Sequence, residues 1–143
     1  MTLYTSDSRN RVLHYICYDL IAAAFFALFG AVYEHFSHEV YSYSMIYAFA
    51  VPLAAGALPL TLLLCRKRAV RMPSAGALVL WHAGLASLTV GLVFRGVLEI
   101  YGTTNRLMPV YPAAGAVLCT AGTLAFVLGK PAPAAASQPQ NLP

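Results

Sequence analysis

The sequence predicts an all-α integral membrane protein, folded as a four-transmembrane-helix bundle of two helical hairpins. Its 143 residues are 59% hydrophobic and 10% charged, and the mean hydropathy is +0.67. A soluble domain carries about 25% charged residues, so most of this surface is expected to face lipid. Four apolar runs are each long enough to cross about 30 Å of hydrocarbon as a helix. Basic residues gather beside these runs in the pattern of the positive-inside rule.

The spans follow one another with short links. Backbone groups inside lipid must bond within the chain, and runs this long favour helices over barrel strands. Pro52 and Pro59 lie inside the second run and are expected to bend it. The predicted transmembrane domain covers residues 13–130, with spans at about Leu13 to His35, Tyr43 to Cys65, Ala75 to Ile100 and Val110 to Gly129.

The basic residues predict the orientation. Arg95 and Arg106 stand alone towards one side, and the others lie towards the opposite side, at Arg9, Arg11, Arg66, Lys67, Arg68, Arg71 and Lys130. Both termini are therefore expected to be cytoplasmic. Residues 1–12 would form a cytoplasmic N-terminal segment, and the proline-rich residues 131–143 a disordered cytoplasmic tail. The first run is long for a signal peptide and carries Asp19. From the small size and this topology we assume a multi-pass protein of a plasma membrane, of the bacterial inner-membrane type.

The two predicted hairpins show a weak internal repeat. The segment Phe29 to Phe36 aligns with Phe94 to Tyr101, and this alignment places Glu34 over Glu99. Both halves would cross the membrane in the same direction, which predicts a parallel repeat about an axis along the membrane normal.

Polar residues of the predicted outer side form one candidate cluster. Small residues precede Glu34 at helical spacing (Ala23, Ala27 and Gly30), and others precede Glu99 in the same way (Gly84, Ser87, Gly91 and Arg95). Small residues mark faces where membrane helices approach closely, so both stripes are predicted to face the bundle interior. Charged groups at their ends should be paired there. We therefore expect an ion-pair network of Glu34, Arg95 and Glu99 that joins the hairpins.

The same cluster is also a candidate binding site. Glu34 and His38 lie four residues apart and, with Glu99, could hold a divalent metal such as zinc. Arg95 lies one turn from Glu99 and disfavours a bound cation, so an anionic or zwitterionic ligand is the alternative. His35 and Glu39 are expected to be surface residues.

A second polar pair is predicted nearer the cytoplasmic side. Asp19 and His82 fall at equal depth in their spans, so a hydrogen bond between them is feasible. His82 lies opposite the Gly84–Gly91 face, however, which favours an interfacial histidine beside Trp81. A proton-relay step is the alternative. A haem held by His14 and His82 is the least favoured interpretation.

Other chemistry is not indicated. The three cysteines lie in apolar runs without a C-x-x-C pair, which argues against a disulfide framework. No nucleophile-elbow, zinc-protease, Walker or Rossmann motif occurs, and the basic residues give no nucleic-acid patch. The preferred prediction is a non-enzymatic accessory or scaffold subunit in the lipid bilayer, with a second copy or another membrane protein as partner. Small-ligand or divalent-metal binding or transport through the outer cluster is the first alternative. A haem- or quinone-linked redox protein is the second.

Overall fold

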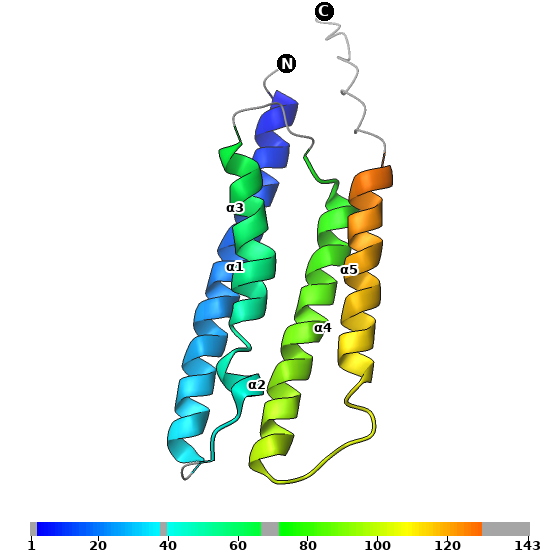
Figure 1. The fold of residues 1–143 in the computed structure, drawn as a ribbon. Coiled ribbons are helices and arrows are strands. Elements are labelled where there is room, and N and C mark those ends of the chain that lie inside the picture. The colour runs from blue at the N-terminus through cyan, green and yellow to red at the C-terminus, as the bar shows by residue number, and fades with distance from the viewer. Residues whose placement is uncertain (1–2, 38–39, 67–71, 130–143) are drawn as a thin grey trace, which may run out of the picture.

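The computed structural model has four long helical segments that run side by side (Figure 1). It describes residues 3–37, 40–66 and 72–129, and no strand occurs in these ranges. The elements in order are α1 (Leu3–Phe36), α2 (Tyr43–Ile46), the π-helix η1 (Val51–Ala57), α3 (Leu58–Cys65), α4 (Ala75–Ile100) and α5 (Val110–Leu128). Four segments are long and apolar enough to span a membrane: Ser8–Phe36, Tyr43–Cys65, Ala75–Ile100 and Val110–Leu128. The predicted all-helical membrane class is therefore confirmed, whereas the repeat and the orientation stay predictions.

The helix bounds follow the predicted spans closely, except at the start of the chain. The second and third spans begin and end where the sequence places them, and α5 stops at Leu128. Helix α1 already begins at Leu3, well before the predicted start at Leu13. The tail at 131–143 lies outside the described residues. We call the end where α4 stops the Glu99 end and the end where α3 stops the Arg66 end.

The two prolines of the second span break it into three helical pieces. Leu58 N–H donates to the Leu53 carbonyl, five residues back, which makes the intervening turn π-helical. Pro59 has no N–H, so the carbonyl of Ala55 loses its α-helical donor. Trp81 on α4 replaces that donor, because its Nε1 donates to the Ala55 carbonyl at 3.0 Å. The predicted bend is thus a π-helical segment tied to α4.

Two glycines of α4, Gly84 and Gly91, face α5, whereas Gly96 faces Met45 of the first hairpin. A Cβ added to Gly84 would lie 2.5 Å from Cys119 Sγ, and one added to Gly91 would lie 2.6 Å from Tyr111 Cβ. On the α5 side, a Cβ on Gly122 would lie 2.8 Å from the Trp81 backbone nitrogen. The stripe was predicted to face the bundle interior, and its glycines Gly84 and Gly91 pack on α5 while Glu99 at its end bonds to Ser42 of the first hairpin. A small-residue stripe indicates a close helix without telling which one, and here it is the nearest in sequence.

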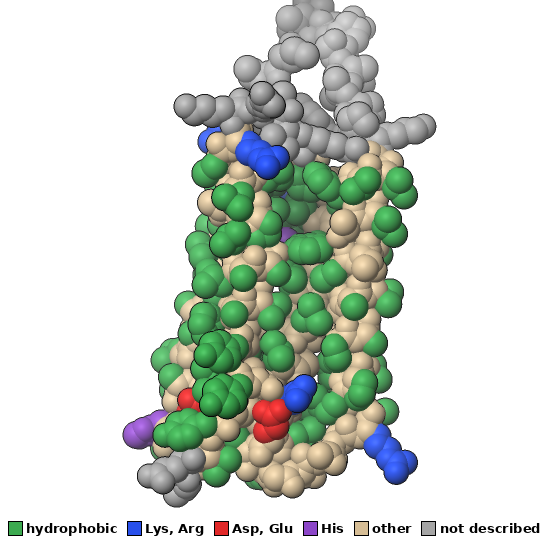
Figure 2. Space-filling model, viewed as in Figure 1, with side chains coloured by type: hydrophobic (Ala, Val, Ile, Leu, Met, Phe, Trp, Pro, Cys, Tyr) green, Lys and Arg blue, Asp and Glu red, His purple; other side chains and the backbone are tan. Residues whose placement is uncertain are grey.

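Helix α4 is the central element of the bundle. Its opposite side contacts α2 and η1, whereas α5 contacts α4 alone among the described elements. The enclosed apolar core is small and centres on Val12, Leu60 and Leu78. Large apolar side chains instead cover the length of the bundle, and charged ones lie near its two ends (Figure 2). Such a surface is suited to lipid and would be unfavourable in water.

Candidate functional site

Glu99 is the centre of a hydrogen-bonded group at its end of the bundle. Arg95 Nε donates to Glu99 Oε1 at 2.8 Å, one turn along the same helix. Ser42 Oγ donates to Glu99 Oε2 at 2.6 Å, and Ser44 Oγ donates to Oε1 at 3.2 Å. Bonds to an ionised carboxylate are stronger than neutral ones. Glu99 therefore joins α4 to the α2 segment of the first hairpin.

A cavity of about 630 Å³ opens beside this group. It lies between α4, the start of α5, the link at 101–109 and the start of η1. Most of its wall is apolar, with Val51, Leu88, Leu92 and Met108 among the lining residues. Its volume falls within the range of about 300–1,000 Å³ that is usual for small-molecule sites.

The polar side of the cavity comes from the end of α4 and the following link. Arg95 and Glu99 line it together with Thr103, Thr104 and Asn105. Asn105 Oδ1 accepts from Leu107 N–H at 2.9 Å, a bond that orders the link. The cavity thus combines an apolar wall with hydroxyl, amide and guanidinium groups.

Arg95 is the cation of this cavity. Its side chain is 66% exposed, against 38% for Glu99. Among the described residues, the guanidinium group of Arg95 donates to a protein acceptor only through Nε, which bonds to Glu99. The two terminal nitrogens carry further N–H donors, which is the arrangement that binds carboxylate or phosphate oxygens.

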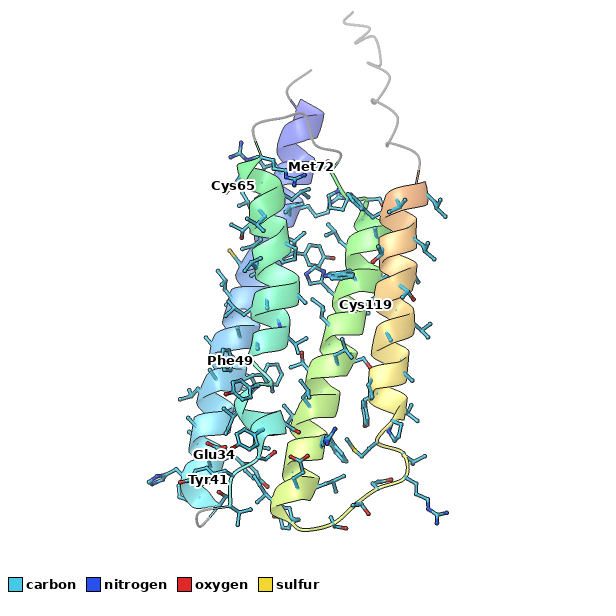
Figure 3. All side chains as sticks on the ribbon, viewed as in Figure 1. Glu34, Tyr41, Phe49, Cys65, Met72 and Cys119 are labelled. Atoms are coloured by element: carbon cyan, nitrogen blue, oxygen red, sulfur yellow. The ribbon has the colours of Figure 1, made fainter. Side chains whose placement is uncertain are left out.

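Glu34 does not join Arg95 and Glu99. It lies at the lower end of α1, close to α2 in Figure 3, and makes no ion pair with Arg95. Its Oε1 is buried and has no hydrogen-bond partner among the described residues. Arg95 bonds instead within its own helix, to Glu99. At this end the hairpins are joined by the bonds of Ser42 and Ser44 to Glu99 and by a hydrogen bond between Tyr33 and Tyr101, and not by an ion pair of Glu34.

The predicted metal set of Glu34, His38 and Glu99 is not assembled by the described residues. His38 lies outside them, as does Glu39. Within residues 3–37, 40–66 and 72–129, no group of three or more His, Cys, Asp or Glu side chains could hold a metal ion. The metal site therefore stays a prediction.

The second predicted pair, Asp19 and His82, meets across the two hairpins. His82 Nε2 lies 3.0 Å from Asp19 Oδ2, and His82 Nδ1 lies 2.8 Å from the Leu78 carbonyl. The ring of Tyr15 packs on the imidazole with centroids 4.4 Å apart. This side of α4 packs against η1, and the imidazole of His82 points inward to the Asp19 and Tyr15 side chains of α1. Both ring nitrogens have hydrogen-bond partners, and the haem interpretation stays a prediction.

Several contacts of these two sites were not expected. Ser42 caps α2, since it accepts from Met45 N–H, and it also bonds to Glu99. Gly56 lies directly against the Asp19 carboxylate. A glycine between two prolines opposite an intramembrane aspartate is a signal that could have identified this contact. Comparisons of the chain with protein-family models, with curated proteins and with solved structures found no match.

Proposed function

We propose that this is a non-enzymatic membrane protein that binds an anionic or zwitterionic amphiphile of the phospholipid type. The observation that carries the proposal is the exposed Arg95 guanidinium at the rim of an apolar cavity, at the end of a membrane-spanning helix.

The polar groups suit an oxygen-rich head group. A guanidinium donates two parallel N–H bonds to phosphate or carboxylate oxygens. Glu99 holds Nε at 2.8 Å, which restrains the side chain before a ligand binds. Thr103 and Thr104 can donate or accept through their hydroxyls, and they line the same cavity.

The apolar wall suits the body of the same molecule. Leu92 and Leu88 lie one and two turns below Arg95 on α4 and line the cavity with Val51. Arg95 lies about 7 Å from the end of α4 by helix rise, at the depth where a long basic side chain reaches the membrane surface. An amphiphile would therefore place its head at Arg95 and its tail along Leu92 and Leu88.

The test is lipid binding by the full chain in mild detergent, followed by native mass spectrometry. The probes are short-chain phosphatidylglycerol and phosphatidylcholine. An Arg95→Gln variant should bind phosphatidylglycerol about 10- to 100-fold more weakly, because a charged hydrogen bond contributes about 1.5–3 kcal/mol.

Arg106→Gln is the matched control, since Arg106 is exposed in the same link and does not line the cavity. It should change the affinity by about twofold or less, as expected for an exposed charge. Equal losses in the two variants would mean that surface charge alone attracts the lipid. Equal binding by wild type and Arg95→Gln would overturn the proposal.

The orientation forms part of this proposal. We place the Arg66 end on the cytoplasmic side of a plasma membrane, which puts the cavity on the outer face. Cys65 is exposed at the Arg66 end. A membrane-impermeant maleimide should label a Thr104→Cys variant from outside intact cells and reach Cys65 only after permeabilisation. The reverse order would invert the topology.

An accessory or scaffold role is a second candidate, supported by the packing of α5. This helix contacts α4 alone among the described elements, and Val117 on its outer side is exposed. A partner helix would shield that side. A Val117→Cys variant should then form a specific disulfide cross-link in membranes, whereas labelling by a lipid-soluble probe with no cross-link would count against this role.

A further inference from the structure

Asp19 and His82 form a buried polar centre within the membrane-spanning part of the bundle. Asp19 is 5% exposed, and the side chain of His82 is 15% exposed. Three elements meet there, because α1 carries Asp19, α4 carries His82, and η1 supplies the backbone of Gly56. A Cβ on Gly56 would lie 2.5 Å from the Asp19 carboxylate, so that carboxylate rests directly on the π-helix.

The hydrogen bonds of His82 determine how many protons the pair holds. Nδ1 lies 2.8 Å from the Leu78 carbonyl oxygen, which can only accept, so Nδ1 must carry a proton. Nε2 lies 3.0 Å from Asp19 Oδ2, and a hydrogen bond there needs a second proton, either on the ring or on the carboxyl. An ionised aspartate with a neutral histidine would hold only one proton between them. Hydrogen bonds at both ring nitrogens at once therefore require one proton more.

We propose that Asp19 and His82 together form a binding site for a single proton inside the membrane-spanning bundle, and that this site is occupied near neutral pH. The occupied site is either an imidazolium–carboxylate pair or a neutral imidazole with a carboxylic acid. The proton comes from water and returns to water, and no group is oxidised or reduced. Both forms have zero net charge.

The surroundings favour this neutral form. Loss of the proton would leave one negative charge away from water and would break either the bond to Leu78 or the bond to Asp19. Unpaired charges within a membrane are costly. Occupancy of the site also holds α1 against α4, because Asp19 and His82 lie on different hairpins.

The neighbouring titratable groups do not replace this proton. On α1, Tyr15 packs on the His82 ring, and Arg11 lies about two turns earlier at about 12 Å of helix rise. The η1 segment facing Asp19 consists of apolar residues and glycine. From α5, Cys119 Sγ lies 3.8 Å from the carbonyl of Trp81, the residue before His82. The α3 residues Leu58–Leu64 carry no titratable side chain.

The test is nitrogen NMR of the full chain with ¹⁵N-labelled histidine in lipid nanodiscs, from about pH 5 to about pH 9. His14 is the internal control for an exposed histidine, because its Nδ1 also lies near a carbonyl four residues back, Asn10 O at 2.7 Å. A His82→Gln variant assigns the His82 signals. We expect the His82–Asp19 site to hold its second proton through neutral pH.

An Asp19→Asn variant distinguishes this site from a histidine that is merely buried. Asparagine preserves the shape and cannot ionise, so His82 should then lose its second proton at a lower pH than in the wild type. A wild-type site that has lost its second proton by neutral pH would overturn the proposal, whether or not the variant folds. An unchanged His82 midpoint in a folded Asp19→Asn protein would overturn it as well.

Discussion

Replacing Gly56 by alanine would place a methyl group against the Asp19 carboxylate. The added Cβ would lie 2.5 Å from the Asp19 Cγ and Oδ2 atoms and 2.7 Å from Oδ1. Ordinary contacts begin near 3.4 Å, so the carboxylate or the η1 backbone must move by about 1 Å. A shift of the carboxylate would lengthen its 3.0 Å bond to His82.

The magnitude follows from these two alternatives. Overpacking of a tight site costs about 1–3 kcal/mol, and loss of a hydrogen bond to a charged group costs about 1.5–3 kcal/mol. A shift of the carboxylate removes the clash, and a shift of η1 preserves the hydrogen bond, so the two costs do not add. We therefore expect a destabilisation of about 2–3 kcal/mol.

The assay is the free energy of unfolding in mixed detergent micelles, followed by circular dichroism. Gly76→Ala is the control, because a Cβ on Gly76 meets nothing within 4 Å. That variant should stabilise α4 by up to about 1 kcal/mol. In an Asp19→Ala background the carboxylate is absent, so Gly56→Ala should no longer cause overpacking. The double variant should then be about as stable as Asp19→Ala alone. A Gly56→Ala protein as stable as the wild type would refute the close contact on which this reasoning depends.

Three further variants test other contacts of the fold. Gly84→Val should separate α4 from α5 and cost about 1–3 kcal/mol in unfolding free energy, and wild-type stability would contradict the close helix approach. Ser42→Ala removes a donor to Glu99 and should lower the unfolding free energy by about 1.5–3 kcal/mol. An equal loss in a Glu99→Gln background would show that the two residues are not coupled. Trp81→Phe leaves the Ala55 carbonyl without its donor and should cost about 1–3 kcal/mol, with an unchanged melting curve as the contrary result.

The spans could be predicted from the sequence because their cause is local. A run of apolar residues has to be about as long as the hydrocarbon layer is thick, and Tyr43–Cys65 and Ala75–Ile100 begin and end as expected. Pro52 and Pro59 likewise indicated a break in the second span. The π-helical form of that break depends on Trp81, a residue from another helix, and no local pattern contains it.

The polar contacts were predictable only where depth alone determined them. Asp19 and His82 were placed at equal depth, and they do meet. Glu34 and Glu99 were also placed at equal depth, yet Arg95 bonds to Glu99 alone of the two. The difference lies in the rotation of the helices, and the glycines of α4 do not fix it alone, since Gly84 and Gly91 approach α5 whereas Gly96 approaches Met45. Helical spacing gives the relative direction of side chains on one helix but does not name the partner of each face.

The most direct test of the proposed lipid site is a map of where a bound amphiphile lies. A phosphatidylglycerol with a photoreactive group in its acyl chain can be cross-linked to the full chain in nanodiscs and located by peptide mass spectrometry. We predict adducts at Leu88, Leu92 and Met108, the apolar wall below Arg95, and their loss in the Arg95→Gln variant. The proposed lipid site would be contradicted by adducts at equal levels in both proteins, spread over exposed outward residues such as Val117 and Leu124.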